Sequence, residues 1–208
     1  MSNYKAIIES AKNATIVAAT KYVDSTKMRE LLVNNITHFG ENRVDSFLIK
    51  FEELKDCNNI TWHFIGTLQT NKVKKMIDKI SYLHSLNSIK LAQYINKYRT
   101  TPLNCFLEIN LTNSNTKTGL LPTDIDAVLA EINNLENINI IGLMTMTEPI
   151  MSDEEKITVF NKLGKIKQEL NEKGYNKITH LSMGMSDDYL LAVQCNATFL
   201  RLGRILFS

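Results

Sequence analysis

The chain has 208 residues, 44% of them hydrophobic and 22% charged, and its formal net charge is +2 at pH 7. This length and composition are typical of one globular domain with a sizeable core, and we predict a single domain over residues 1–208. The nearly balanced charge gives no general electrostatic reason to expect nucleic acid as a partner. No apolar run reaches the length needed to cross a bilayer, so a membrane partner is not predicted either.

The three cysteines, Cys57, Cys105 and Cys195, are far apart, and no two of them form a C-x-x-C pair. An odd count without metal-ligand spacing indicates reduced thiols in a reducing compartment. The N-terminal residues 1–5 lack the apolar region and cleavage site of a signal peptide. The sequence therefore predicts a cytoplasmic protein.

Short apolar runs alternate along the chain with longer stretches in which apolar residues recur at helical spacing. The eight runs span residues 15–20, 37–40, 62–66, 80–84, 104–111, 138–146, 178–182 and 198–202. The helical stretches after the first seven runs span or begin at residues 25–34, 43–54, 71–77, 88–98, 123, 153–173 and 186–193. This alternation predicts parallel strands, because parallel neighbours need a crossover helix.

Eight strand–helix units predict an α/β fold, the closed (β/α)8 TIM-like barrel. The runs show little period-2 alternation, as expected for strands that a ring of helices covers. An open doubly wound sheet would alternate in the same way, but the chain has no dinucleotide-binding fingerprint. Because the chemistry of such barrels takes place at the C-terminal ends of the strands, residues just after each run are the candidates for a site.

The loop between the seventh and eighth runs has features of a phosphate site. Gly184 lets the backbone approach a ligand closely, and Ser186 lies where a helix can begin. Backbone N–H groups at a helix N-terminus bind phosphate well, and loops after strands seven and eight often hold phosphate in barrels. An ordinary strand–turn–helix cap would use the same residues, so both interpretations stay open from this loop alone.

Lys21 directly follows the first apolar run. A lysine in this place can simply extend its ammonium group into solvent. At a barrel mouth that partly shields it from water, a lysine can instead form a Schiff base with an aldehyde. A phosphate site across the same mouth makes pyridoxal 5′-phosphate (PLP) the natural aldehyde, because one cofactor would use both features.

Arg201 lies inside the eighth apolar run. A buried arginine needs a partner, because it does not shed its charge. A salt bridge inside the barrel is one possibility. The pyridine nitrogen of PLP is the other, and it would then stay unprotonated, which makes the ring a weaker electron sink and suits holding the cofactor.

Other polar features are assigned no function from the sequence. The basic run 71–76 is interpreted as a solvated helix face, because no aromatic residues interleave with it as in a nucleic-acid patch. His38, His84 and His180 are interpreted as core or rim residues, since no carboxylate accompanies them at metal-ligand spacing. Lys117 is interpreted as an exposed loop lysine, with a second, transient PLP contact as the alternative.

Several segments carry a family resemblance and run in order over nearly the whole chain. They are AATK at 18–21, FGEN at 39–42, the stretch 62–72 that opens with WHFIG, GLM at 142–144, LSMGMSDD at 181–188 and RLG at 201–203. The stretches 62–72 and 182–188 are the most specific of these. On these segments the chain resembles the PLP homeostasis proteins, a family of PLP-binding proteins often labelled YggS-like.

The resemblance implies a fold-type III PLP barrel, similar to the N-terminal domain of alanine racemase. It implies PLP as the cofactor, held by Lys21 as an internal aldimine, with Arg201 facing the pyridine nitrogen. Asn42 and His63 would line the ring pocket. The cofactor-binding residues expected on this basis are Lys21, Asn42, His63, Ser182, Gly184, Met185, Ser186, Arg201 and Gly203.

The phosphate, by the same resemblance, would contact Ser182, the backbone of residues 184–186 and Gly203. The family has a small hydroxyl residue after its Arg-x-Gly segment, whereas this chain has Arg204 there. Arg204 would either contact the phosphate as a cation or point outward. Because the sequence stops at Ser208 and little precedes the first strand, we expect the helices that close the barrel to be short or absent.

Three functions are consistent with these sequence features. The first is a carrier for intracellular PLP homeostasis, expected to be a monomer that delivers PLP to apoenzymes; family members are thought to buffer and deliver PLP, with no firm catalytic activity. The second is a racemase-like enzyme with weak one-base activity from Lys21. The third is a barrel that binds another phosphorylated metabolite. We favour the carrier over the enzyme, because resembling racemases take a tyrosine base from across a dimer and use a β-rich domain that has no counterpart after residue 202.

Overall fold

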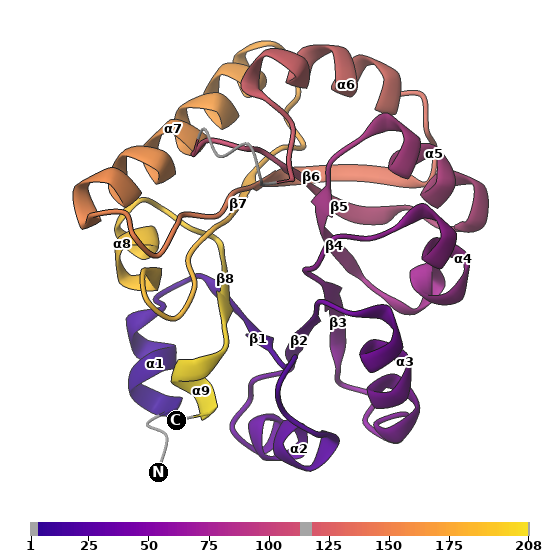
Figure 1. Cartoon of the computed structure of the whole chain (residues 1–208), viewed down its shortest axis with the longest axis vertical. Coiled ribbons are helices and arrows are strands. Elements are labelled where there is room, and N and C mark those ends of the chain that lie inside the picture. The colour runs from indigo at the N-terminus through magenta and orange to yellow at the C-terminus, as the bar shows by residue number, and fades with distance from the viewer. Residues whose placement is uncertain (1–3, 113–117, 208) are drawn as a thin grey trace.

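The computed structural model describes residues 4–112 and 118–207, and the loop residue Lys117 lies outside them. Eight parallel strands form a closed barrel in chain order (Figure 1). The strands are β1 Thr15–Ala19, β2 His38–Glu41, β3 Thr61–Phe64, β4 Tyr82–Leu86, β5 Leu103–Glu108, β6 Ile138–Met144, β7 His180–Ser182 and β8 Phe199–Leu202. The barrel prediction is confirmed, and an open sheet is excluded because β8 pairs with β1.

Helices ring the barrel on its outside (Figure 1). They are α1 Tyr4–Ser10, α2 Ser25–Val33, α3 Val44–Glu53, α4 Val73–Met76, α5 Ile89–Tyr98, α6 Ile125–Ile132, α7 Asp153–Glu172, α8 Tyr189–Gln194 and α9 Arg204–Phe207. Three 3-10 turns accompany them: η1 Thr70–Lys72, η2 Ile77–Lys79 and η3 Pro122–Asp124. Within the described residues, the helix before β1 has seven residues and the helix after β8 has four.

Alternate residues of each strand face opposite sides of the barrel wall. Val17 belongs to a small cluster with Phe106 and Phe199, whereas its neighbour Ala18 belongs to the large cluster that includes the helices. The rings of Phe106 on β5 and Phe199 on β8 are 5.1 Å apart between centroids. Since β5 and β8 are not neighbours in the barrel, this contact crosses the interior, which is filled by side chains.

Two helices differ from the sequence prediction. After β3 the expected single helix is three short turns, η1, α4 and η2. After β7 the helix begins at Tyr189 rather than at Ser186, because the Asp188 carboxylate accepts the Met185 N–H at 2.6 Å and closes a turn before the helix. The added turn places Ser186 in the loop between β7 and α8. Within residues 4–112 and 118–207, none of the helices has the length and apolar character to span a bilayer.

Candidate functional site

The predicted site residues come from strands whose C-terminal ends meet on one face of the barrel, here called the C-terminal rim. Strand β1 pairs with β8 so that Val17 is opposite Arg201 and Ala18 is opposite Leu202. Lys21 and Gly203 therefore both follow the paired strands on the same face. The register brings together residues that are about 180 positions apart in sequence.

Lys21 is exposed and lies just beyond the end of β1. Its ammonium group lies 4.8 Å from the centroid of the Tyr22 ring, and Tyr22 itself is 84% exposed. The partial shielding expected at a barrel mouth is therefore not present around Lys21, because its side chain extends from a turn above the wall. The amine is open to solvent and to any ligand at the rim.

Arg201 is 5% exposed, and it is paired in register with Val17, which belongs to the small interior cluster. Its guanidinium donates to the Ser182 hydroxyl at 2.6 Å and to the Thr145 carbonyl at 2.9 Å. Burial lowers the pKa of Arg201 to about 10, and the charges of Asp188 and Glu108 oppose that decrease. Arg201 therefore keeps its positive charge at neutral pH.

The salt bridge considered for Arg201 is absent among the described residues, where both of its partners are neutral oxygen atoms. Glu108, at the end of β5, is also buried, and burial raises the pKa of its carboxyl group. The Glu108 carboxylate accepts hydrogen bonds from Thr118 at 2.7 Å and Asn87 at 3.5 Å. The charges of the Arg201 guanidinium and the Glu108 carboxylate thus affect each other's pKa, although the hydrogen bonds described for each group go to other residues.

Three histidines extend the hydrogen bonding of Arg201 through the barrel interior. Nδ1 of His84 is 2.7 Å from the Ser182 hydroxyl, Nε2 of His84 is 2.9 Å from Nδ1 of His63, and Nε2 of His63 is 2.9 Å from Nδ1 of His38. We call these residues, from His38 to Arg201, the histidine chain. It crosses from the half-buried start of β2 to the buried residues Ser182 on β7 and Arg201 on β8.

Burial favours the neutral forms of the three histidines in the histidine chain. Burial, followed by the charges of neighbouring groups, lowers the pKa of His63 and of His84 well below its usual value, and burial lowers that of His38. A neutral imidazole has one N–H donor and one acceptor nitrogen. Arg201 can only donate, so the Ser182 hydroxyl accepts from it and can donate to Nδ1 of His84. His84 can then donate from Nε2 to Nδ1 of His63, and His63 from Nε2 to Nδ1 of His38. In this arrangement each of these hydrogen bonds has one donor and one acceptor.

His63 was expected to line a ring pocket. The structure buries its side chain completely and stacks its ring on Tyr82, with centroids 4.5 Å apart. Both ring nitrogens are engaged by other histidines. His63 is thus linked to Arg201 through His84 and Ser182, and its contact with a ligand ring stays a prediction.

The loop after β7 holds the predicted phosphate residues. Gly184 has φ +91°, and a Cβ there would lie 2.6 Å from Cβ of Ala192, so the backbone requires glycine. The Met185 N–H is donated to Asp188 within the loop, and the second carboxylate oxygen of Asp188 accepts the Thr147 hydroxyl. The predicted phosphate contact of the Met185 N–H therefore competes with a hydrogen bond already made.

Ser186 and Gly203, predicted separately, are brought together. The Ser186 hydroxyl accepts the Gly203 N–H at 3.2 Å and the Ile205 N–H at 3.4 Å. Gly203 has no positive φ, and the nearest atoms to a Cβ placed on it are those of Ala19, at 3.7 Å. The protein's own backbone and packing therefore do not demand glycine at 203, because a Cβ there would meet Ala19 at an ordinary van der Waals distance.

Arg204 points away from Ser186. Its guanidinium binds both carboxylate oxygens of Asp187, one at 2.6 Å, in an exposed ion pair between the β7–α8 loop and α9. Of the two positions considered for Arg204, the structure has the outward one. The Asp187 carboxylate is likewise turned outward, so neither charge is directed at Ser186.

Asn42, just after β2, has a side-chain oxygen that is buried and has no hydrogen-bond partner among the described residues. Its backbone packs so closely on Gly66 that a Cβ there would lie 2.2 Å from the Asn42 carbonyl oxygen. A fixed, unpartnered acceptor is costly to bury. A ligand at the rim that carries a hydrogen-bond donor could donate to this Asn42 oxygen.

Sequence reasoning did not assign Thr145 or His84 to the site. Thr145 follows β6 and His84 lies within β4, and both support Arg201, directly or through Ser182. The signal for His84 was its place two residues after Tyr82, since residues at that spacing face the same side of a strand. The contacts that Thr145 and His84 make with Arg201 and Ser182 become evident only when the register of the barrel strands is known.

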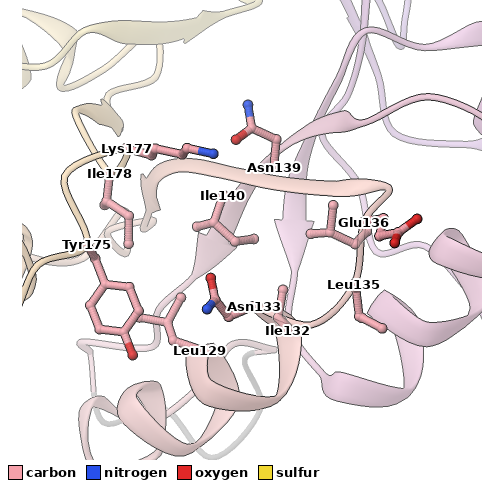
Figure 2. Close-up of a pocket in the computed structure, with 11 residues that line it drawn as sticks. Leu129, Ile132, Asn133, Leu135, Glu136, Asn139, Ile140, Tyr175, Lys177 and Ile178 are labelled. Atoms are coloured by element: carbon pink, nitrogen blue, oxygen red, sulfur yellow. The ribbon is translucent and has the colours of Figure 1, made fainter.

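A separate cavity has a volume of about 260 Å³, and Figure 2 shows the residues that line it. It is lined by the C-terminal end of α6, the start of β6 and the loop before β7, including Leu129, Asn133, Asn139, Tyr175 and Lys177. These residues lie at the start of β6 or precede β6 and β7, so they are at the N-terminal ends of the strands. None of the predicted site residues lines this cavity.

Comparison with known proteins identifies the family. The family model "Alanine racemase, N-terminal domain" matches residues 1–208. A pyridoxal phosphate homeostasis protein of Aquifex aeolicus is 36% identical over 198 residues, which are 94% of this chain and 86% of that protein. A protein of the same name from Synechocystis sp. is 33% identical over 197 residues, 93% of this chain and 90% of that protein.

Solved structures agree with this assignment. PipY of Synechococcus elongatus, in a structure with PLP bound, superposes with a TM-score of 0.93 at 30% identity and covers 100% of this chain and 99% of its own. An alanine racemase of Clostridium difficile shares the fold with a TM-score of 0.75 at 19% identity, and this chain spans 56% of its length. The chain therefore belongs to the family of pyridoxal phosphate homeostasis proteins, built on the fold of the alanine racemase N-terminal domain.

Proposed function

We propose that this protein binds PLP at the C-terminal rim and serves as an intracellular PLP carrier that buffers the cofactor and delivers it to apoenzymes. The observation that carries the proposal is the joint placement of two features just after the paired strands β1 and β8. One is the exposed lysine, Lys21, and the other is the pair of backbone N–H groups of Gly203 and Ile205, which converge on the Ser186 hydroxyl. The presence of PLP in the related PipY structure supports the choice of ligand.

The phosphate end of PLP would lie beside Gly203. The N–H groups of Gly203 and Ile205 both point at one oxygen atom, the Ser186 hydroxyl. A phosphate oxygen has the same acceptor chemistry and a stronger charge. Ser186 would then donate its own hydroxyl proton to the phosphate, with the Gly184 backbone shaping the loop.

The ring of PLP would face Arg201. Because Arg201 keeps its charge, it can only donate, and the pyridine nitrogen would stay unprotonated as the acceptor. Such a ring stabilises a carbanion less well than a pyridinium does. Ser182, whose hydroxyl is held between Arg201 and His84, would act by orienting Arg201, and its own phosphate contact stays a prediction.

Lys21 would hold PLP as an internal aldimine. The ε-amine adds to the aldehyde, the C=O bond is replaced by C=N, and one water molecule leaves. The reverse reaction needs only water, and the exposure of Lys21 supplies it. Reversible attachment in an open site suits storage and release, whereas enzymes that stabilise carbanions close their sites against water.

Racemase-like activity from Lys21 alone is the alternative. A carrier should show no enzyme-like turnover of alanine or serine enantiomers, and such turnover would overturn the proposal. We further propose a monomeric, cytoplasmic protein with a single domain over residues 1–208.

The proposal is tested by adding PLP to protein freed of cofactor and recording the long-ultraviolet band of an aldimine. A PLP analogue that keeps the ring and phosphate but lacks the aldehyde is the control, and it should bind without the band. The loaded protein should then restore activity to a cofactor-free PLP enzyme. A protein that stays colourless with PLP but binds another phosphorylated metabolite would support the third function considered above.

A further inference from the structure

A buried ion pair lies directly beneath the turn that carries Lys21. The Lys50 ammonium on α3 donates to Oε1 of Glu41 on β2 and to the Thr20 carbonyl oxygen, both at 2.6 Å. The Thr20 hydroxyl donates to the same Glu41 oxygen, also at 2.6 Å. The side chains of Lys50 and Glu41 are 10% and 0% exposed, so the pair is almost fully removed from water.

Stability alone does not account for such a pair. Removing two charges from water is costly, and well-packed apolar side chains in their place are often as stable or more so. The second carboxylate oxygen of Glu41 is buried and has no hydrogen-bond partner among the described residues. The Lys50–Glu41 pair thus places charges at buried positions where apolar side chains would not carry the cost of desolvation.

The contact with Thr20 connects the pair to the site. The Thr20 carbonyl also accepts the Val23 N–H at 3.1 Å, which closes a turn around Lys21 and Tyr22. The Thr20 carbonyl and the Lys21 N–H share one rigid peptide plane. Lys50 therefore fixes the plane from which Lys21 begins.

Lys21 itself has little else to fix it. It lies beyond the last residue of β1, its side chain is exposed, and its described contact is with the exposed Tyr22 ring. The backbone turn thus sets the direction in which the amine extends. The hydrogen bond from Lys50 to the Thr20 carbonyl holds this turn in place. It therefore determines how often the Lys21 amine reaches a ligand at the rim.

We infer that Lys50 and Glu41 are positioning residues that orient Lys21 for reaction with the aldehyde, an inference that rests on the proposed function. Removal of the pair should leave the phosphate and ring contacts in place. It should lower the fraction of bound PLP that is covalently attached.

The main test replaces both members of the pair, Lys50→Met with Glu41→Met, so that no lone buried charge remains. PLP is added to the folded variant at saturation. Total bound PLP is measured by equilibrium dialysis, and covalent PLP by borohydride reduction and mass spectrometry. We expect the ratio of covalent to total PLP to fall roughly tenfold, as misplaced reactive groups do, with total binding little changed and the pH profile of the aldimine band shifted.

Lys156→Met is the matched control, because Lys156 is similarly buried but pairs with Asp153 on its own helix, α7. Glu41→Gln is a milder second variant that keeps the shape of the side chain if the double replacement does not fold, and it should give an intermediate decrease. An unchanged covalent fraction and pH profile in both variants would overturn the inference alone. Absence of PLP on Lys21 in the unaltered chain would instead overturn the proposed function and the inference with it.

Discussion

The Arg201 guanidinium and the Ser182 hydroxyl are 2.6 Å apart, between neighbouring strands β8 and β7. The Ser182 oxygen also lies 2.7 Å from Nδ1 of His84. One small hydroxyl group therefore joins the buried cation to the histidines that cross the barrel. This relationship gives Ser182 a role in holding Arg201 that its place beside the phosphate loop did not suggest.

Ser182→Ala should destabilise the protein by about 1–3 kcal/mol, because it leaves a buried guanidinium N–H and a buried histidine nitrogen without a partner. Urea unfolding measures the change. Thr158→Ala is the control, since its exposed hydroxyl donates to the Glu154 carbonyl of its own helix, and it should change stability by less than about 0.5 kcal/mol. Equal effects of the two replacements would contradict the assigned role of Ser182.

Gly203→Ala should weaken PLP binding at least about tenfold, the equivalent of ~1.4 kcal/mol, by filling the space beside the Gly203 N–H. The same replacement should leave folding intact, because the added Cβ would meet Ala19 at 3.7 Å, an ordinary van der Waals distance. Gly164→Ala on α7 is the matched control and should stabilise the helix by roughly 0.5–1 kcal/mol without changing PLP affinity. Titration of PLP absorbance gives both affinities, and undiminished binding by the Gly203 variant would place the phosphate elsewhere.

The free energy of unfolding should decrease as the pH falls below about 6.5. Burial lowers the pKa values of His63 and His84 in the folded protein, so the unfolded chain binds more protons and stability is lost toward acid. Each histidine that stays neutral in the folded state should remove roughly 1.4 kcal/mol between about pH 7.5 and about pH 5.5.

The comparison variant for this pH dependence is His63→Gln. Glu108, whose pKa burial raises, has the opposite sign, since it adds stability as the pH falls, but it is present in both proteins and cancels. The difference in unfolding free energy between the unaltered chain and the variant should therefore narrow toward acid. Parallel pH curves for the two proteins would show that His63 is protonated in the folded state.

Arg204→Ser should tighten PLP binding roughly two- to tenfold relative to Arg204→Ala, by supplying one hydroxyl hydrogen bond to the phosphate. Both variants lose the same exposed ion pair with Asp187, which stabilises the fold by no more than about 1 kcal/mol. The comparison therefore isolates the hydroxyl group. Identical affinities of the Ser and Ala variants would indicate that residue 204 does not reach the phosphate.

The barrel could be predicted from the sequence because its eight apolar runs and crossover helices follow from local patterns. Lys21, Ser186 and Gly203 could be placed on one rim for the same reason. The start of α8 could not be placed correctly, because it depends on the Asp188 carboxylate accepting the Met185 N–H. A side chain that competes with the helix for a backbone donor shifts the boundary by several residues.

The hydrogen bonds of the histidine chain inside the barrel could not be predicted from local sequence patterns. His63 and His84 looked like separate core or site residues, and their hydrogen bond depends on the register in which β3 pairs with β4. The sequence analysis assigned no role to Lys50, because its contact with Thr20 depends on how α3 lies against the turn after β1. Long-range register and packing, rather than composition, determine these contacts.

The most direct test of the account is borohydride reduction of the PLP-loaded protein, followed by peptide mass spectrometry. We predict that the reduced PLP adduct lies on Lys21, and that Lys21→Ala loses both the adduct and the long-ultraviolet band while remaining folded. A Lys21→Ala protein that keeps the band, or an adduct found on another lysine of the unaltered chain, would contradict the assignment of Lys21 as the residue that holds the cofactor.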